Sequence, residues 1–324
     1  MTAEEFSSLY LRAINGLAAT GWHWFDYHFH VGPTAFARSI MSSCASINRR
    51  AANIGADLLD ELVGIGGRER DEDQYEQLLQ KLAEILVIER VVNCPWPDVT
   101  TFLHEPAANP GGPRPELLVS TPDGRLVVEV KTPALFKHIR ARAANAVQLP
   151  YRGVVPLDVA ERLAQGTVTL PRDNPVLDFL RDGERKFAGF REEPNTTSLL
   201  VIVWDDYIYE PISALVNGAS GLLTQSSYSR TATGTAEIFP NIDAIVALRH
   251  LNYFVAASRE EPLIDRQNGL DFGDENALPN VLFTLPGARP IPDFVLDALR
   301  AYPHDDPGLR MFAEYNPQDI VFWI

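Results

Sequence analysis

Two short segments of this chain are apolar at nearly every position, and they constrain the fold more than any other feature. Residues 198–205 have the sequence SLLVIVWD, and residues 243–249 have the sequence DAIVALR. A strand with one solvated face alternates apolar and polar residues, whereas these runs indicate strands that are covered on both faces. Buried strands that alternate with helical segments predict an α/β layered fold.

The rest of the chain alternates between helical and extended patterns. Apolar residues recur at helical spacing in residues 3–19, 34–63, 73–92, 134–147, 175–190 and 293–302, and short strands are expected at 100–104, 281–285 and 321–324. We expect residues 1–70 to form an N-terminal helical extension. Residues 71–324 would then form the α/β domain, with an insertion near 148–174, where prolines interrupt the pattern.

Composition limits the classes of protein that fit. Two cysteines, Cys44 and Cys94, exclude a disulfide framework and a cysteine-rich zinc site. The chain has no basic start followed by an apolar core and no run of about 18 apolar residues, so we expect a cytoplasmic protein without a membrane partner. The net charge of −15 argues against a simple nucleic-acid binder unless positive charge is local. The most basic stretch holds Arg114, Arg125, Lys131, Lys137, His138, Arg140 and Arg142.

That basic stretch contains the most informative segment, PELLVSTPDGRLVVEVKTP, at residues 115–133. Strands at 117–120 and 125–131, joined by the turn residues 121–124, predict a β-hairpin in which Pro122 sets φ and Gly124 takes a positive φ. Because side chains alternate along a strand, Glu129 and Lys131 share one face. Glu116, at the outer start of the first strand, returns close to Glu129.

Two carboxylates and one ammonium group in this arrangement suit metal-assisted hydrolysis. Glu116 and Glu129 would repel one another unless positive charge lay between them. Oxygen ligands of this kind suit Mg²⁺, which binds a phosphate oxygen and lowers the pKa of a bound water. Lys131 would orient that water or stabilise the developing negative charge. These residue types therefore predict hydrolysis of a phosphodiester bond.

The pattern Pro115-Glu116, hairpin, Glu129-x-Lys131 resembles the signature of the PD-(D/E)xK, or restriction-endonuclease-like, nucleases, with Glu in place of the commoner Asp at the first acid. The resemblance covers roughly residues 73–250. It implies a mixed central sheet, Mg²⁺ with Mn²⁺ as a substitute, cleavage of DNA in restriction or defence, and dimers as in many such nucleases. It also implies further site residues, which are an acid on the preceding helix (Glu76 or Glu84), the Val130 carbonyl as a metal ligand, and Lys186.

Other interpretations remain open from the sequence. The hairpin with its Glu129–Lys131 pair could be exposed and purely structural, and the chain could be a non-catalytic interaction protein on the same fold. Pro122-Asp123 also spells the family's first motif, but Asp123 fits a turn residue better. His28 and His30, on an expected strand, resemble the first H-x-H motif of the metal-dependent amidohydrolases, which use TIM barrels. DNA cannot be distinguished from RNA as the substrate.

Overall fold

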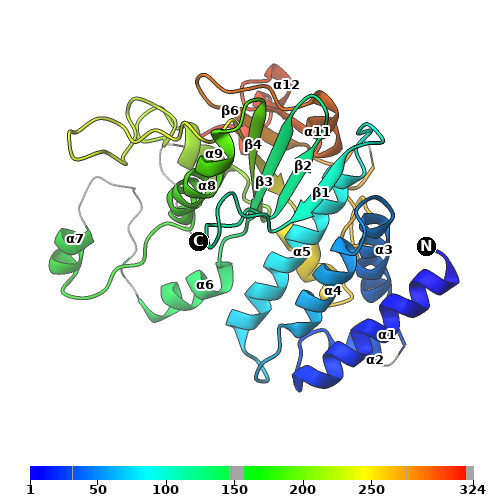
Figure 1. Cartoon of the computed structure of the whole chain (residues 1–324). Helices are drawn as coiled ribbons and strands as arrows, with labels where there is room; N and C mark the ends of the chain where they lie inside the picture. Colours follow the sequence, from blue (N-terminus) through cyan, green and yellow to red (C-terminus); the bar gives the residue numbers. More distant parts are fainter. Residues whose placement is uncertain (31, 146, 148–156, 275, 319–324) are drawn as a thin grey trace.

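The computed structural model describes residues 1–324 except for residues 31, 146, 148–156, 275 and 319–324. Its centre is a seven-stranded sheet in which each strand pairs with the next one along the chain (Figure 1). The strands are β1 (Thr101–His104), β2 (Leu117–Ser120), β3 (Arg125–Lys131), β4 (Thr196–Trp204), β5 (Ala244–Arg249), β6 (Asn280–Thr284) and β7 (Ala301–Pro303).

The sheet is mixed, as expected. The β1–β2, β2–β3 and β5–β6 pairs are antiparallel, while the β3–β4, β4–β5 and β6–β7 pairs are parallel. The two apolar runs of the sequence form β4 and β5, which lie in the middle of the sheet. Parallel neighbours need a crossover on one face, and the described part of the chain between β3 and β4 contains three helices.

Helices cover both faces of the sheet. They are α1 (Ala3–Thr20), α2 (Asp26–His30), α3 (Ala35–Arg50), α4 (Ile54–Gly64), α5 (Glu72–Val92), α6 (Leu135–Ala144), α7 (Leu157–Ala164), α8 (Pro175–Arg191), α9 (Tyr209–Val216), α10 (Leu251–Ser258), α11 (Asp293–Ala298) and α12 (Pro307–Arg310), with a 3₁₀ turn at Ala313–Tyr315. No helix in the described part of the chain is long and apolar enough to cross a membrane.

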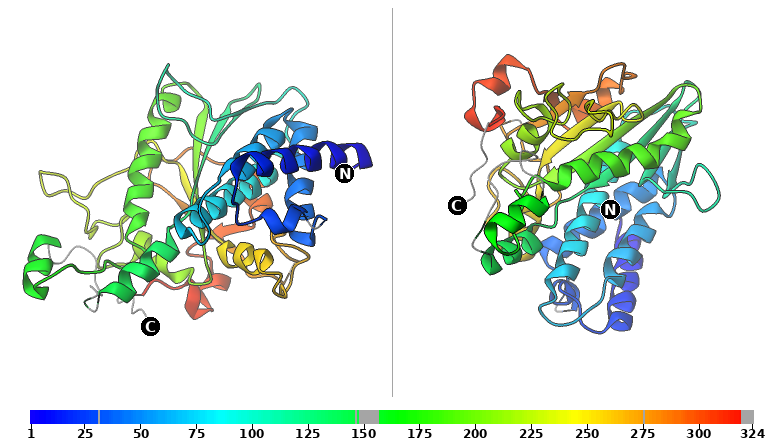
Figure 2. Two further views of the ribbon diagram at one scale, coloured as in Figure 1. Left: turned by 90° about the horizontal axis from the view of Figure 1, so that it is seen from below. Right: turned by 90° about the vertical axis from the view of Figure 1, so that its left-hand side faces the viewer.

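Alternation along the strands divides the core into two clusters. Val128 and Val130 of β3 pack in one cluster with α1, α3, α4 and α5, whereas Val127 packs in the other with α8 and α9. Figure 2 shows α8, in green, crossing one face of the sheet while the blue N-terminal helices lie on the other side. The helices of residues 1–70 therefore share a hydrophobic cluster with α5 and the sheet.

The structure corrects several local predictions. The single helix expected over residues 34–63 is two helices, because Asn53 adopts a left-handed φ of 71° between α3 and α4. The helix expected at 293–302 ends at Ala298, and β7 follows it. The hairpin turn is present, but Gly124 does not take the predicted positive φ; it is instead needed because a Cβ there would lie 2.6 Å from the Asn195 carbonyl oxygen. The strand predicted at 321–324 lies outside the described residues.

The expected strand at His28 and His30 is also wrong. Both residues lie in α2, a helix of five residues, where positions two apart do not share a face. His28 is buried and contacts the Thr34 hydroxyl at 3.0 Å and the Ser258 carbonyl at 2.9 Å, while His30 pairs with Asp26 at 2.7 Å. An open sheet with β1 and β7 at its edges is also not a TIM barrel. The amidohydrolase interpretation loses its structural basis.

Close packing of α3 on α4 gives a test of this helix pair. A Cβ at Gly55 would lie 2.0 Å from the Cys44 carbonyl oxygen, whereas a Cβ at Gly64, on the same helix, would meet nothing within 4 Å. Gly55→Ala should therefore lower the free energy of unfolding by about 1–3 kcal/mol. Gly64→Ala, the matched control, should change it by less than about 1 kcal/mol. Urea unfolding of both variants measures the difference, and equal stabilities would contradict the packing described.

Candidate active site

The β2–β3 hairpin brings the two predicted carboxylates to adjacent positions. Leu117 pairs with Val128, so the register places Glu116 opposite Glu129, one position beyond the last pair. The Thr121 amide donates to the Gly124 carbonyl at 2.9 Å, which confirms that Asp123 belongs to the turn. Glu116 and Glu129 are both buried, so the hairpin is not an exposed structural element at this end.

Glu129 lies at the centre of the site, and its side chain has no solvent exposure. Its Oε1 atom accepts from Lys131 Nζ at 2.7 Å and from Lys186 Nζ, on α8, at 2.6 Å. Its Oε2 atom is buried without a hydrogen-bond partner among the described residues. Two ammonium groups thus share one oxygen, and the other oxygen remains able to accept a ligand.

Asp182, also on α8, is a second acidic partner of both lysines. Its Oδ2 atom lies 2.7 Å from Lys131 Nζ and 3.9 Å from Lys186 Nζ, and Arg185 pairs with its other oxygen. Burial alone would raise the pKa of Asp182, but Lys131 and Arg185 hold it below its ordinary value. Burial likewise would lower the pKa of Lys131, but Glu129 and Asp182 raise it.

Glu116 also lies near Lys186, with its Oε1 atom 3.8 Å from Lys186 Nζ. Burial, together with the negative charges of Glu84 and Glu129, raises the pKa of Glu116 to about 8. Glu84, on α5, is also buried, and burial raises its pKa although it pairs with Lys81. Three carboxylates, one just before β2, one on β3 and one on α5, therefore interact electrostatically at this end of the hairpin.

The structure distinguishes between the two helix acids left open by the sequence. Glu84 lies close enough to Glu116 for its negative charge to raise the pKa of Glu116. Glu76 lies two turns earlier on α5. Glu76 accepts from the Lys137 amide at 2.8 Å and lines a separate cavity of about 420 Å³ with residues of α6 and α10. Glu84 is thus brought together with the hairpin acids, and Glu76 is not.

Comparisons with family models, with curated proteins and with solved structures find no match to this chain. The roles of its residues are therefore inferred from the side chains themselves. Sequence reasoning missed two members of the site, Lys81 and Asp182. Both carried a signal, because Lys81 precedes Glu84 by three positions and Asp182 precedes Lys186 by four, which are the spacings of neighbours on a helix.

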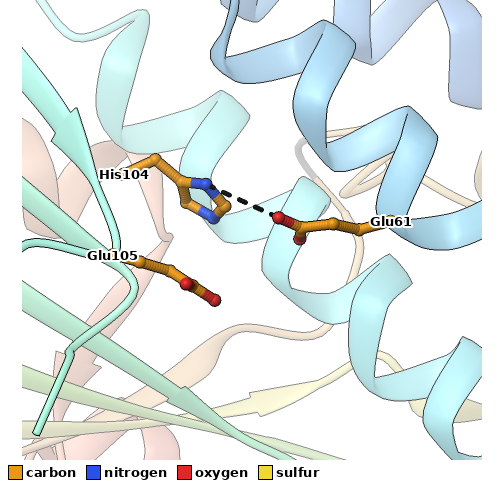
Figure 3. Close-up of side chains that lie close together, drawn as sticks. All are labelled: Glu61, His104 and Glu105. Carbon is orange, nitrogen blue, oxygen red and sulfur yellow. Dashed lines mark ion pairs between the residues drawn. The ribbon is translucent and has the colours of Figure 1, made fainter.

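A second group of donors lies beside the first. Glu61 of α4, His104 at the end of β1 and the following Glu105 each offer a ligand atom, and these atoms lie within 4.8 Å of one another (Figure 3). Glu61 also pairs with Lys81 at 2.7 Å. A donor set that includes imidazole suits transition metals better than Mg²⁺. The carboxylates of Glu116 and Glu129 lie outside this close group, and Lys186 Nζ lies 3.8 Å from the first and 2.6 Å from the second.

The raised pKa of Glu116 predicts a pH dependence of stability. In the folded chain its carboxyl stays protonated up to about pH 8, whereas in the unfolded chain it ionises near its ordinary value of 4.5. Between pH 4.5 and about pH 8 the Glu116 carboxyl is protonated in the folded chain and ionised in the unfolded chain. The free energy of unfolding therefore falls as the pH rises through this range. Glu116→Gln should remove that loss.

Urea unfolding in the presence of a chelator measures the effect. We compare the free energy of unfolding of Glu116→Gln with that of wild type at each pH. The difference, variant minus wild type, should be more than about 1 kcal/mol larger at about pH 8 than at about pH 5. Glu105→Gln is the matched control, because Glu105 is exposed at the neighbouring strand end. An equal difference between Glu116→Gln and wild type at both pH values would contradict the assigned environment.

Proposed function

We propose that this chain is a Mg²⁺-dependent nuclease that hydrolyses phosphodiester bonds of DNA. The observation that carries the proposal is the fully buried Glu129 carboxylate, which has two lysines on one oxygen and, within the described part of the chain, no hydrogen-bond partner on the other. Burying a carboxylate in this way costs several kcal/mol of desolvation. A protein that needed only a stable core would gain by an apolar side chain at this position.

The donor atoms are of the chemical type that a hard divalent cation prefers. Glu84, Glu116 and Glu129 offer carboxylate oxygens only, and one of these is the Oε2 atom of Glu129, which has no hydrogen-bond partner among the residues that the structure describes. Oxygen ligands of this kind suit Mg²⁺, with Mn²⁺ as the substitute. The Val130 carbonyl remains a proposed ligand through the resemblance to the PD-(D/E)xK nucleases. Glu84 takes the role proposed for the acid on the helix, in preference to Glu76.

The chain's own residues then have separate tasks. Bound Mg²⁺ would supply Lewis-acid chemistry at a phosphate oxygen. Lys131, with its Nζ atom 2.7 Å from Glu129, donates a hydrogen bond to the attacking water or to the oxygen on which negative charge develops. Lys186, whose Nζ atom lies 2.6 Å from the same oxygen of Glu129, contributes a second positive charge near the leaving group.

The fold is compatible with this proposal. An antiparallel hairpin followed by parallel strands between two helical layers resembles the core of restriction-endonuclease-like proteins, and the acids lie on the hairpin as that resemblance implies. A role in restriction or defence, a homodimer and a cytoplasmic location belong to the same proposal.

Cleavage of plasmid DNA with Mn²⁺ tests the function. Lys131→Ala should reduce the cleavage rate by at least about 100-fold, because it removes the charge nearest to the reacting groups. Lys137→Ala is the control, since Lys137 is exposed on α6 and makes the same change of charge. Thermal unfolding of each variant verifies the fold. If Lys131→Ala cleaves as fast as wild type, the assigned role is wrong.

The net charge of −15 favours a second candidate, a non-catalytic interaction protein on this fold. A titration with Mn²⁺ separates the two functions. The nuclease should show a Mn²⁺ site that is lost in Glu129→Gln, because the buried carboxylate is its central ligand. The interaction protein should show no such site, and DNA should remain intact with every metal tested.

A further inference from the structure

The ammonium group of Lys131 lies at the same distance from two carboxylates, which belong to different elements. Its Nζ atom lies 2.7 Å from Glu129 Oε1, two positions earlier on β3, and 2.7 Å from Asp182 Oδ2 on α8. The side chain of Lys131 is 16% exposed, so water competes only weakly for its ammonium group. The direction in which this ammonium group points therefore depends on the balance between Glu129 and Asp182.

A cation at Glu129 would upset this balance. Lys131 and Lys186 both donate to Glu129 Oε1, at 2.7 and 2.6 Å, and a divalent ion on the same carboxylate would repel both ammonium groups. The lysines then need another acceptor nearby, since an unpaired charge with little solvent access is costly. Asp182 is already within 2.7 Å of Lys131 and 3.9 Å of Lys186.

We propose that Asp182 is a positioning residue of this site, which holds Lys131 and Lys186 beside Glu129 and becomes their partner when a divalent cation binds to Glu129. The inference rests on the proposed function and adds to it a residue that acts through the two lysines. Without Asp182, Lys131 would pair with Glu129 alone, Lys186 would pair with Glu129 and Glu116, and both ammonium groups would compete with the cation at Glu129. Replacing an outer group that orients the partners of a metal ligand typically changes metal affinity by roughly 10–100-fold, and Asp182 would act in this way through the lysines that pair with Glu129.

The helix that carries Asp182 also provides a matched control. Asp178 lies one turn earlier on α8 and is exposed, so Asp178→Asn makes the same chemical change away from the lysines. Asp182→Asn keeps the size of the side chain and removes its charge. Should Asp182→Asn fail to fold, Asp182→Ser removes the same charge and gives the same prediction.

Isothermal titration of the full chain with Mn²⁺ alone provides the test. Asp182→Asn should raise the Kd for Mn²⁺ by roughly 10–100-fold, while Asp178→Asn leaves it unchanged. In a Lys131→Met background the same Asp182→Asn substitution should cost less than about threefold, because the ammonium group at 2.7 Å from Asp182 is absent and Lys186 lies farther away, at 3.9 Å. This loss of effect identifies action through Lys131, which a purely structural role would not produce.

Two results would overturn the inference while leaving the proposed function intact. One is a Glu129-dependent Mn²⁺ site in wild type whose Kd is unchanged in Asp182→Asn. The other is an equal cost of Asp182→Asn with and without Lys131. If wild type shows no Mn²⁺ site that depends on Glu129, the proposed function fails and the inference fails with it.

Discussion

The burial of one carboxylate, that of Glu129, determines the arrangement of charge around it. A carboxylate without solvent contact must be paired, and Lys131 from its own strand and Lys186 from α8 both donate to it. Those lysines also lie near further acids, Lys131 at 2.7 Å from Asp182 and Lys186 at 3.8 Å from Glu116. The hairpin, α8 and α5 are therefore connected by charge as well as by apolar packing, in a network that a cation would rearrange.

Much of the fold follows from patterns that are local in the sequence. β4 and β5 are apolar on both faces, and their neighbours are recognisable from alternation and from the turn at residues 121–124. The shared face of Glu129 and Lys131 was equally predictable, because a strand has a period of two. In each case a few consecutive residues are sufficient for the prediction, and the structure confirms these strands.

The choice between Glu76 and Glu84 could not be made in this way. The two acids are eight positions apart on one helix, so they lie on roughly the same side and about 12 Å apart along its axis. Only the packing of α5 against the hairpin determines which acid faces Glu116. Asp182 shows the same limit, because its spacing to Lys186 is visible in the sequence but its contact with Lys131 depends on how α8 crosses β3.

The order of the strands in the sheet has a consequence for how the chain reaches this structure. Every strand pairs with the one that precedes it, from β1 to β7, so no strand has to insert between two that are already paired. During synthesis the sheet can therefore grow from one edge as each new strand emerges, and each addition closes only the loop that precedes it. On this route the β2–β3 hairpin, with both of its acids, is assembled before α8 supplies Lys186.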